Sequence, residues 1–416
     1  MRKKLFLAYI YGPRNAGDMA LNYGALDLLN SVGEFEIVGL SRFSAEDEGF
    51  LYSKRRLETT YPNLQMIPYP VSYDRHRAGV CCQLLSHARG ASMYLRSVIK
   101  RAGGGGDELD VAIGCSDHVL FNGGNALFSR GLRDVPRLGG VLYPLYRARV
   151  LGKPIAFLPQ SIAAASGLGG RWIQRYLDGA WFVAFRESIS CQGIHVKSTR
   201  PLCALDLAFL MEGMDNDGAE AILAHHKLKP HQFVPVLPRG MTLGDQRDLP
   251  QREYAATIRL TVELCKEIID TGLSPVFVLH VKTDLKVIGD CRAALGAEGY
   301  DVGVVEEYDP LKLRALYAWA RAVYTMRLHA AIFALSVGTI AVGFHRSIWG
   351  PKMPGIFSDL GIKDLCFGLD TASSINPICL GRMSCDDRAL PYRQVFLERI
   401  RAKKDELVSR LKQGLQ

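Results

Sequence analysis

The sequence lacks the cysteine and histidine spacings of a metal site. Its ten cysteines are scattered, apart from the adjacent Cys81 and Cys82, and no CxxC pair or Cys/His ligand spacing occurs. We interpret the cysteines as the reduced thiols of a cytosolic protein, and we expect neither a metal nor a cofactor.

Long apolar runs are also missing, since no stretch approaches the roughly 20 residues needed to span a bilayer. The opening MRKKLFLAYIYG imitates a signal peptide, but it continues into PRNAGD without a small-residue cleavage site. This favours a first buried strand. We therefore expect a cytoplasmic protein, with peripheral association with the inner face of the cytoplasmic membrane left open.

The basic residues do not form the pattern of a nucleic-acid-binding protein. Lys and Arg number 51 against 42 Asp and Glu, a net charge of +9, but no basic cluster is interleaved with aromatic residues. The excess favours anionic partners such as phosphorylated substrates or lipid headgroups. We expect no nucleic acid among the partners.

The length of 416 residues predicts two domains, because a single core rarely extends over so long a chain. Apolar strand-like runs alternate with helix-like segments throughout, which is typical of layered α/β folds. We predict two Rossmann-like, doubly wound domains facing a central cleft. The N-terminal domain covers residues 1–210, the C-terminal domain 211–385, and a C-terminal helix lies within 386–416.

The expected elements follow from these patterns. Strands are predicted at residues 5–11, 35–40, 64–69, 110–115, 118–121, 154–158, 181–185 and 200–204, and at 233–238, 274–281, 300–306, 320–326 and 339–344. Helices are predicted at residues 18–29, 78–101, 137–149, 170–177, 253–269, 286–295, 310–320, 329–335 and 392–411. The glycine-rich run at 101–110 is expected to be a flexible connection.

Two glycine-containing turns follow predicted strands in the first half. In YGPRNAGD, Gly12 and Gly17 permit a tight turn and Asp18 is a candidate helix N-cap, so the turn is either structural or an anion site at a helix start. In FNGGNALF, Gly123 and Gly124 allow a close approach of backbone to another group.

Polar and charged residues end several other strands. Gln160 and Ser161 either face the cleft or cap the next helix. Arg186 needs an anion, which is either Glu187 or a ligand phosphate or carboxylate. Arg239 ends a strand in the second half in a similar way.

The most informative segment is AVYTMRLHAAIFALSVGTIAVGF. Arg327, Leu328 and His329 follow an apolar strand and begin a helix, where the helix dipole adds to the attraction for an anion. A cation beside a titratable imidazole suits an anionic substrate that must exchange protons. The structural alternative is an arginine paired with a carboxylate and a histidine with its hydrogen bonds satisfied. The isolated His280 is interpreted as a satisfied structural histidine.

The predicted helix at 78–101 has an apolar stripe that includes Ala88 and Leu95, with arginines and lysines around it. Such a helix could contact a membrane surface. A core-facing helix with a solvated basic side is the favoured interpretation.

In their order along the chain, these motifs resemble the polysaccharide pyruvyl transferase family. The matching segments are GPRNAGD, NGGNALF, PQSI, RES, DLAF, RLHA followed by GTIAVGF, and GFHRSIWGPKMPGIFSDLG, together covering roughly residues 5–370. The chain departs from the family in having Asn122 where many relatives have glycine, and Ala163 where relatives often have another residue.

The resemblance implies a fold similar to that of B-type glycosyltransferases, with phosphoenolpyruvate as donor and a sugar hydroxyl pair as acceptor, free or lipid-linked. It also implies site residues. His329 would transfer protons and Asp18 would orient or deprotonate the acceptor. Phosphoenolpyruvate would be bound by Arg327, Leu328, Arg186, Arg239 and Lys352. The acceptor would be contacted by Asn15, Gly123, Gly124, Asn125, Gln160 and Ser161.

Two other functions stay open from the sequence. One is a nucleotide-sugar-dependent glycosyltransferase of the same architecture, for which Glu306 and Glu307 are candidate ribose ligands. The other is a non-catalytic relative that binds glycans.

Overall fold

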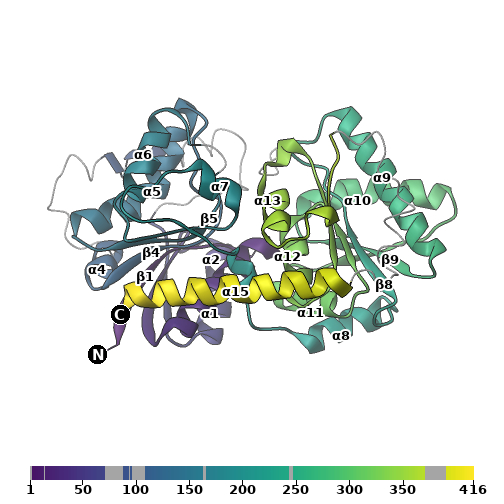
Figure 1. Ribbon diagram of the computed structural model, residues 1–416, viewed down its shortest axis with the longest axis horizontal. Helices are drawn as coiled ribbons and strands as arrows, with labels where there is room; N and C mark the ends of the chain where they lie inside the picture. The colour runs from purple at the N-terminus through teal and green to yellow at the C-terminus, as the bar shows by residue number, and fades with distance from the viewer. Residues whose placement is uncertain are drawn as a thin grey trace. The chain divides into compact units, whose positions relative to one another are not determined.

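The computed structural model describes residues 2–13, 15–70, 88–92, 94–95, 108–162, 165–242, 247–370 and 390–416. Contacts divide the chain into two compact units (Figure 1). Unit 1 comprises Met1–Pro13, Leu21–Met211 and Lys403–Gln416, and unit 2 comprises Arg14–Ala20 and Glu212–Ala402. Neither unit is one continuous segment, because the start of the first helix belongs to unit 2 and the end of the last helix belongs to unit 1.

Unit 1 is built on a seven-stranded sheet whose strand pairs are all parallel, in the order β3-β2-β1-β4-β5-β6-β7. Its strands are apolar and almost entirely buried, as expected where helices cover both faces. They are β1 (Lys3–Ile10), β2 (Phe35–Ser41), β3 (Leu64–Ile67), β4 (His118–Phe121), β5 (Ile155–Gln160), β6 (Phe182–Phe185) and β7 (Leu202–Cys203). The strand order reverses between β1 and β4.

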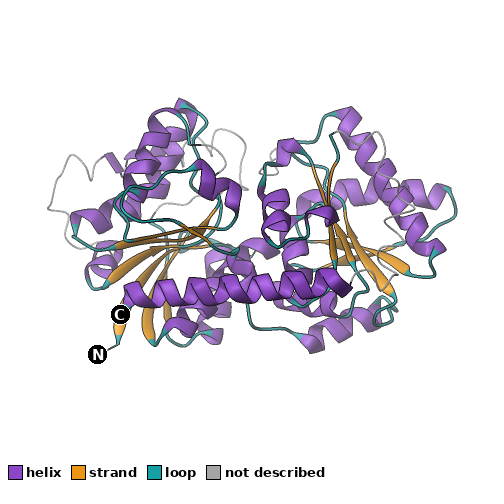
Figure 2. Ribbon diagram, viewed as in Figure 1, coloured by secondary structure: helices purple, strands orange, loops and turns teal. Residues whose placement is uncertain are grey.

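Helices lie on both sides of this sheet (Figure 2). The elements are α1 (Ala16–Val32), α2 (Glu48–Thr60), α4 (Glu108–Gly114), η1 (Leu132–Asp134), α5 (Val135–Val150), α6 (Gly167–Leu177), α7 (Ser188–Gly193) and η2 (Leu207–Leu210). The main core packs α4, α5 and α6 against the strands through residues such as Ile113, Leu138 and Ile173.

Three predictions in this unit need correction or addition. Residues 110–114 belong to helix α4, and Cys115 to the turn after it, and they do not form a strand, because a short apolar run such as VAIG is compatible with either element. Asp18 is not the N-cap of α1, which begins at Ala16; the Asn15 side chain accepts from Gly17 N at 2.9 Å instead. The polar helix α2 was not predicted.

Unit 2 has the same architecture, with a sheet of six parallel strands in the order β10-β9-β8-β11-β12-β13. The strands are β8 (Phe233–Leu237), β9 (Ser274–Leu279), β10 (Gly303–Glu306), β11 (Val323–Thr325), β12 (Ala341–His345) and β13 (Cys366–Gly368). The helices are α8 (Asn216–His225), α9 (Gln251–Asp270), η3 (Lys282–Asp284), α10 (Leu285–Ala297), α11 (Pro310–Ala318), α12 (Leu328–Ser336), η4 (Ser347–Trp349), α13 (Lys352–Asp359) and η5 (Lys363–Leu365). Here the order reverses between β8 and β11.

These two sheets confirm the predicted class of two Rossmann-like, doubly wound α/β domains. In such sheets ligands bind outside the carboxyl ends of the strands, where the strand order reverses. The fold therefore identifies one candidate ligand position in each unit, beyond β1 and β4 in unit 1 and beyond β8 and β11 in unit 2.

The last helix, α15 (Leu390–Leu415), buries Phe396, Leu407 and Leu411 completely. Its first half belongs to unit 2, where Arg399 donates to Asp359 O at 3.1 Å. Its second half belongs to unit 1, where Lys403 Nζ donates to Cys203 O at 2.8 Å. The helix is therefore an integral part of the packing of each unit.

Only residues 88–92 and 94–95 of the predicted helix at 78–101 fall within the described chain, and they are helical. Ala88 and Leu95, which the stripe placed towards the core, are both exposed. Residues 101–107 of the expected flexible connection lie outside the described residues, and 108–110 belong to α4. In the described part of the chain, no helix is both long enough and apolar enough to cross a bilayer.

Candidate active site

In unit 1, the side chain of Asn122 makes hydrogen bonds that fix the turn after β4, where the strand order reverses. Its Nδ2 donates to Tyr9 O at 2.8 Å and to Asn22 Oδ1 at 3.3 Å, while its Oδ1 accepts from Gly123 N at 2.8 Å. Asn22 in turn bonds both the amide and the carbonyl of Tyr11. All of these groups are buried, so the two asparagines fix the backbone at the ends of β1 and β4.

The two glycines after Asn122 approach other parts of the protein closely. A Cβ at Gly123 would lie 2.5 Å from Leu207 Cδ1 and 2.8 Å from Pro159 O. Gly124 has a φ of +145°, and a Cβ there would lie 2.6 Å from the Tyr11 hydroxyl. The space that these glycines leave is thus occupied by protein atoms, which accounts for both glycines without a ligand.

Gln160 and Asn125 carry amide oxygens that are buried without a hydrogen-bond partner in the described chain. The Gln160 side chain is fully buried, and its Nε2 donates to Asn122 O at 2.7 Å and to Leu158 O at 2.9 Å. Those two carbonyls fix the orientation of the amide group. Two acceptors that lack donors suit a partner rich in hydroxyl groups.

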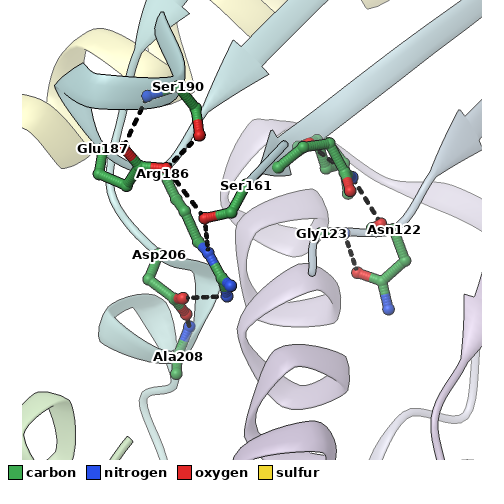
Figure 3. A network of polar contacts seen from close by, with 10 residues as sticks. Asn122, Gly123, Ser161, Arg186, Glu187, Ser190, Asp206 and Ala208 are labelled. Atoms are coloured by element: carbon green, nitrogen blue, oxygen red, sulfur yellow. Dashed lines mark hydrogen bonds and ion pairs between the residues drawn. The ribbon is translucent and has the colours of Figure 1, made fainter. Parts of the chain in front are cut away.

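Arg186 lies in a buried polar network that joins the ends of β5, β6 and β7 (Figure 3). Its Nη1 donates to Asp206 Oδ2 at 2.6 Å and its Nε to Ser161 Oγ at 2.6 Å. The two side chains of the Arg186–Asp206 pair are 2% and 0% exposed. The sequence suggested Glu187 or a ligand as the anionic partner of Arg186. In the structure, Asp206 supplies the carboxylate that pairs with Arg186.

Glu187 completes this network as the N-cap of α7. Its Oε2 accepts from Ser190 N at 2.7 Å and its Oε1 from Ser161 Oγ at 3.1 Å, and Ser190 Oγ also donates to Oε1. Ser161 therefore links the arginine and the glutamate, and it does not cap α6. A buried ion pair with all of its oxygens satisfied holds the strand ends in a fixed arrangement.

In unit 2, Arg327 lies directly after β11, at the reversal of the strand order. It makes a two-pronged ion pair with Asp284: Nε donates to Oδ2 at 2.7 Å and Nη2 to Oδ1 at 2.6 Å. Asp284 ends the short helix η3 that follows β9 and is 2% exposed. This geometry fixes the plane of the guanidinium group.

His329 lies in the first turn of α12, two residues after Arg327, and within unit 2 Gly17 of the GPRNAGD motif packs against its ring. A Cβ at Gly17 would lie 1.9 Å from His329 Nδ1, so no other residue fits there. Asn15 also forms an antiparallel bridge with Val281. Asp18 follows Gly17 and is half-buried. The structure thus brings Asn15, Gly17, Arg327 and His329 together.

His280 is an uncharged neighbour of this group. It is 3% exposed, and its Nε2 lies 2.6 Å from the Tyr317 hydroxyl. Burial, and then the charges of His329 and Arg327, lower the pKa of His280 to about 3. Its interpretation as a satisfied structural histidine agrees with these contacts.

Arg239, which lies two residues after the end of β8 at the reversal point, is held by backbone carbonyls. Its Nε donates to Met241 O at 3.1 Å and its Nη2 to Thr242 O at 2.6 Å, and its guanidinium lies 5.2 Å from the centre of the Trp349 ring. Arg346, at the end of β12, lies 6.0 Å from the same ring. Leu328 and Lys352 are the first residues of α12 and α13, and both are half-buried.

Sequence reasoning missed Asp284, Asp206, Asn22 and Trp349. Asp206 lies in the DLAF motif, and Asp284 follows a strand, so each carried a positional signal. Their partners lie 20 and 43 residues away in sequence, however, and no local pattern encodes such a pairing. Among the described residues, no group of three or more His, Cys, Asp and Glu side chains could hold a metal ion.

Comparison with solved structures supports the fold. Phytolacca americana UGT2 bound to UDP-2fluoro-glucose and pterostilbene has a TM-score of 0.58 at 11% identity, covering 100% of this chain and 99% of that one. LpCGTa in complex with UDP has a TM-score of 0.59 at 11% identity, covering 99% of both chains. Neisseria meningitidis UDP-GlcNAc 2-epimerase bound to UDP-GlcNAc has a TM-score of 0.54 at 11% identity, covering 98% of this chain and 99% of that one. The fold is that of the B-type glycosyltransferases.

Comparison of the sequence identifies the family. Among curated proteins, no sequence matches this chain significantly. The profile of the polysaccharide pyruvyl transferase family matches residues 15–347, which include Asn122, Arg186, Arg327 and His329. The resemblance inferred from the motifs is thereby confirmed, and the chain belongs to the polysaccharide pyruvyl transferase family.

Proposed function

We propose that the protein transfers the enolpyruvyl group of phosphoenolpyruvate to two hydroxyl groups of a sugar in a polysaccharide or its lipid-linked precursor. The product is a pyruvate ketal, and inorganic phosphate is released. No cofactor or metal takes part in this scheme.

The observation that carries the proposal is that Arg239 follows β8 and Arg327 and His329 follow β11, the two paired strands between which the strand order of unit 2 reverses. Two cations suit a donor that has both a carboxylate and a phosphate. A histidine at the start of a helix suits a proton transfer. The close packing of Gly17 on His329 supports this role, because it holds the imidazole in one position.

The reaction balances with these groups. A proton is added to the enol methylene, which becomes a methyl group, and one sugar hydroxyl forms a C–O bond to the adjacent carbon. The C–O bond to phosphate breaks, and the second hydroxyl forms the other ketal bond. Of the two hydroxyl protons, one replaces the proton given to the methylene and the other leaves with phosphate. His329 is the residue we assign to proton transfer, and Asp18 is assigned to the acceptor hydroxyl.

The four cations proposed for the donor differ in their suitability. Arg239 and Arg327 are held in place at the reversal point, and Lys352 begins a helix in the same unit. Arg186 and Arg327 each pair with a buried aspartate, but Arg327 lies two residues from His329 at the reversal point of unit 2, whereas Arg186 and Asp206 both belong to the buried network of unit 1. We therefore assign Arg186 to the support of the strand ends, and phosphoenolpyruvate to Arg239, Arg327, Leu328 and Lys352.

The acceptor is assigned to Asn125, whose side chain is half-buried and whose amide oxygen lacks a donor, with Asn15 as a further candidate. Gln160 and Ser161 are buried and bonded within the protein, so we assign them to the support of the strand ends. Gly123 and Gly124 are better explained by contacts within the protein. An Asn125→Ala change is expected to raise the apparent KM for the acceptor more than that for the donor. The reverse pattern would remove Asn125 from the acceptor site.

A nucleotide sugar is the second candidate donor, because the solved structures of similar fold contain UDP or UDP-sugars. The proposed ribose ligand Glu307 already accepts from the amides of Tyr308 and Asp309 and pairs with Lys312 at 3.2 Å. Glu306 accepts from the Tyr308 hydroxyl at 2.8 Å. These contacts weigh against a ribose site there.

Product analysis separates the two donors. The protein is incubated with polysaccharide from cells that lack it, together with either phosphoenolpyruvate or a UDP-sugar. Release of inorganic phosphate that requires polysaccharide supports the proposal. Release of UDP without phosphate would replace it with the glycosyltransferase function, and absence of both products would favour a glycan-binding relative.

A further inference from the structure

Exposed leucines gather around helix α6 of unit 1. The three most exposed large hydrophobic side chains in the described chain are Leu132 at 72%, Leu168 at 61% and Leu95 at 59%. Leu168 lies in the first turn of α6, and Leu132 begins η1, which packs against α6. Leu95 follows Tyr94, whose hydroxyl lies 3.0 Å from that of Tyr176 and accepts from Trp172 Nε1 at 3.1 Å.

Arginines lie on the same helix as Leu168. Arg171 lies three residues after Leu168, and Arg175 lies four residues after Arg171. These spacings place the three side chains on one side of the helix. Arg171 and Arg175, together with Arg149 from the end of α5, line an open surface cavity of about 690 Å³ beside Leu168. We call Leu95, Leu132, Leu168, Arg149, Arg171 and Arg175 the α6 surface.

Three arginines and one aspartate line this cavity, which gives it a positive charge. Its one acidic side chain, Asp178, accepts from Gln174 Nε2 at 2.8 Å and from Lys197 N at 2.9 Å. No ion pair joins Arg149, Arg171 or Arg175 to an acidic residue within the parts of the chain that the structure describes. The arginines are therefore available to a ligand that carries negative charge.

We propose that the α6 surface binds the anionic headgroups of a lipid bilayer, with its leucines entering the interface and its arginines contacting lipid phosphates. Leucine side chains exposed among basic residues are typical of interfacial binding, in which apolar burial and electrostatic attraction act together. A soluble polyanion would use the arginines but would leave the leucines in water. The inference goes beyond the proposed reaction and does not depend on it.

Vesicle binding tests the proposal without an activity assay. The full chain is sedimented with vesicles of phosphatidylcholine alone and with vesicles that also contain phosphatidylglycerol, at low and high salt. Binding is expected only to the vesicles with phosphatidylglycerol, and high salt is expected to weaken it. Arg171→Gln with Arg175→Gln should weaken it roughly 30-fold, because each basic residue near an anionic surface contributes about fivefold.

Two control variants match these changes. Arg252→Gln with Arg259→Gln alters two exposed arginines of α9 in unit 2, and Leu51→Ser alters an exposed leucine of α2. Both should bind vesicles like the wild type, whereas Leu132→Ser with Leu168→Ser should bind at least tenfold more weakly. All of the changed side chains are exposed, and an unchanged thermal unfolding midpoint confirms that each variant is folded.

Three results would overturn the proposal. The first is that no vesicles are bound, and the second is that the controls weaken binding as much as the α6 variants do. In the third, the leucine variants bind normally and inorganic diphosphate competes fully with the vesicles. That result would identify a site for soluble phosphates instead of a membrane surface.

Discussion

Gly17 lies where the ring of His329 takes up the space that a side chain would need. Gly123 and Gly124 in unit 1 are likewise packed against Leu207 and Tyr11. Each of these three glycines therefore has protein atoms in the space that a side chain would need. Only the contact of Gly17 involves a residue with candidate catalytic chemistry, so Gly17 is the glycine whose substitution tests the site.

Gly17→Ala should displace His329 and lower the rate of pyruvyl transfer by about 10²-fold or more, the usual contribution of one proton-transfer group. Phosphate release from phosphoenolpyruvate measures the rate. Gly289→Ala in α10 is the matched control, because nothing lies within 4 Å of the added Cβ. If the Gly17 variant kept the wild-type rate, His329 would not be the proton-transfer residue.

Arg186 supports a second prediction at the residue scale. Arg186→Met leaves the carboxylate of Asp206 buried without its cation, and this should lower the free energy of unfolding by about 3–5 kcal/mol. Adding Asp206→Leu should restore part of that loss, since the unpaired charge is then removed. Chemical denaturation of both variants measures the effect. An unchanged free energy of unfolding together with a raised KM for phosphoenolpyruvate would assign Arg186 to the donor site.

At the scale of elements, most strands and helices followed from the sequence because apolar runs and helical periodicity report burial directly. The exceptions have physical reasons. Residues 110–115 are too short and too uniformly apolar to distinguish a strand from α4, and α2 is polar enough to resemble a loop. The pairs Arg327–Asp284 and Arg186–Asp206 join different elements, and the sequence carries no local signal for them.

His280, after β9, makes the stability of unit 2 depend on pH. Its pKa is about 3 when folded and 6.5 when free, so the unfolded chain binds the proton more readily. The contribution is complete above pH 6.5 and is lost as the pH falls towards 3, at about 1.4 kcal/mol per pH unit and roughly 5 kcal/mol in all. His280→Gln should flatten the slope of the unfolding free energy between pH 6 and pH 4. A slope equal to that of the wild type would show that His280 is not the titrating group.

At the scale of the whole molecule, the family profile identifies a transferase that acts on polysaccharide, and the two Rossmann-like units have the fold that the resemblance implied. Family membership was predictable because the motifs occur in the expected order, although each of them is short. The division of α1 and α15 between the units was not predictable, because contiguous domains were the simplest expectation from sequence. The α6 surface was not predictable either, since Leu95 lay on a stripe that suggested burial.

The central claim is the transfer of a pyruvyl group from phosphoenolpyruvate to polysaccharide, and mass spectrometry of the glycan tests it most directly. Polysaccharide from cells that lack the protein is incubated with phosphoenolpyruvate and either the wild type or His329→Ala. The proposal predicts that the wild type adds about 70 Da per modified sugar, the mass of a ketal-linked pyruvyl group, and that the variant adds little. An unchanged glycan mass with the wild type, or equal addition by both proteins, would contradict the proposal.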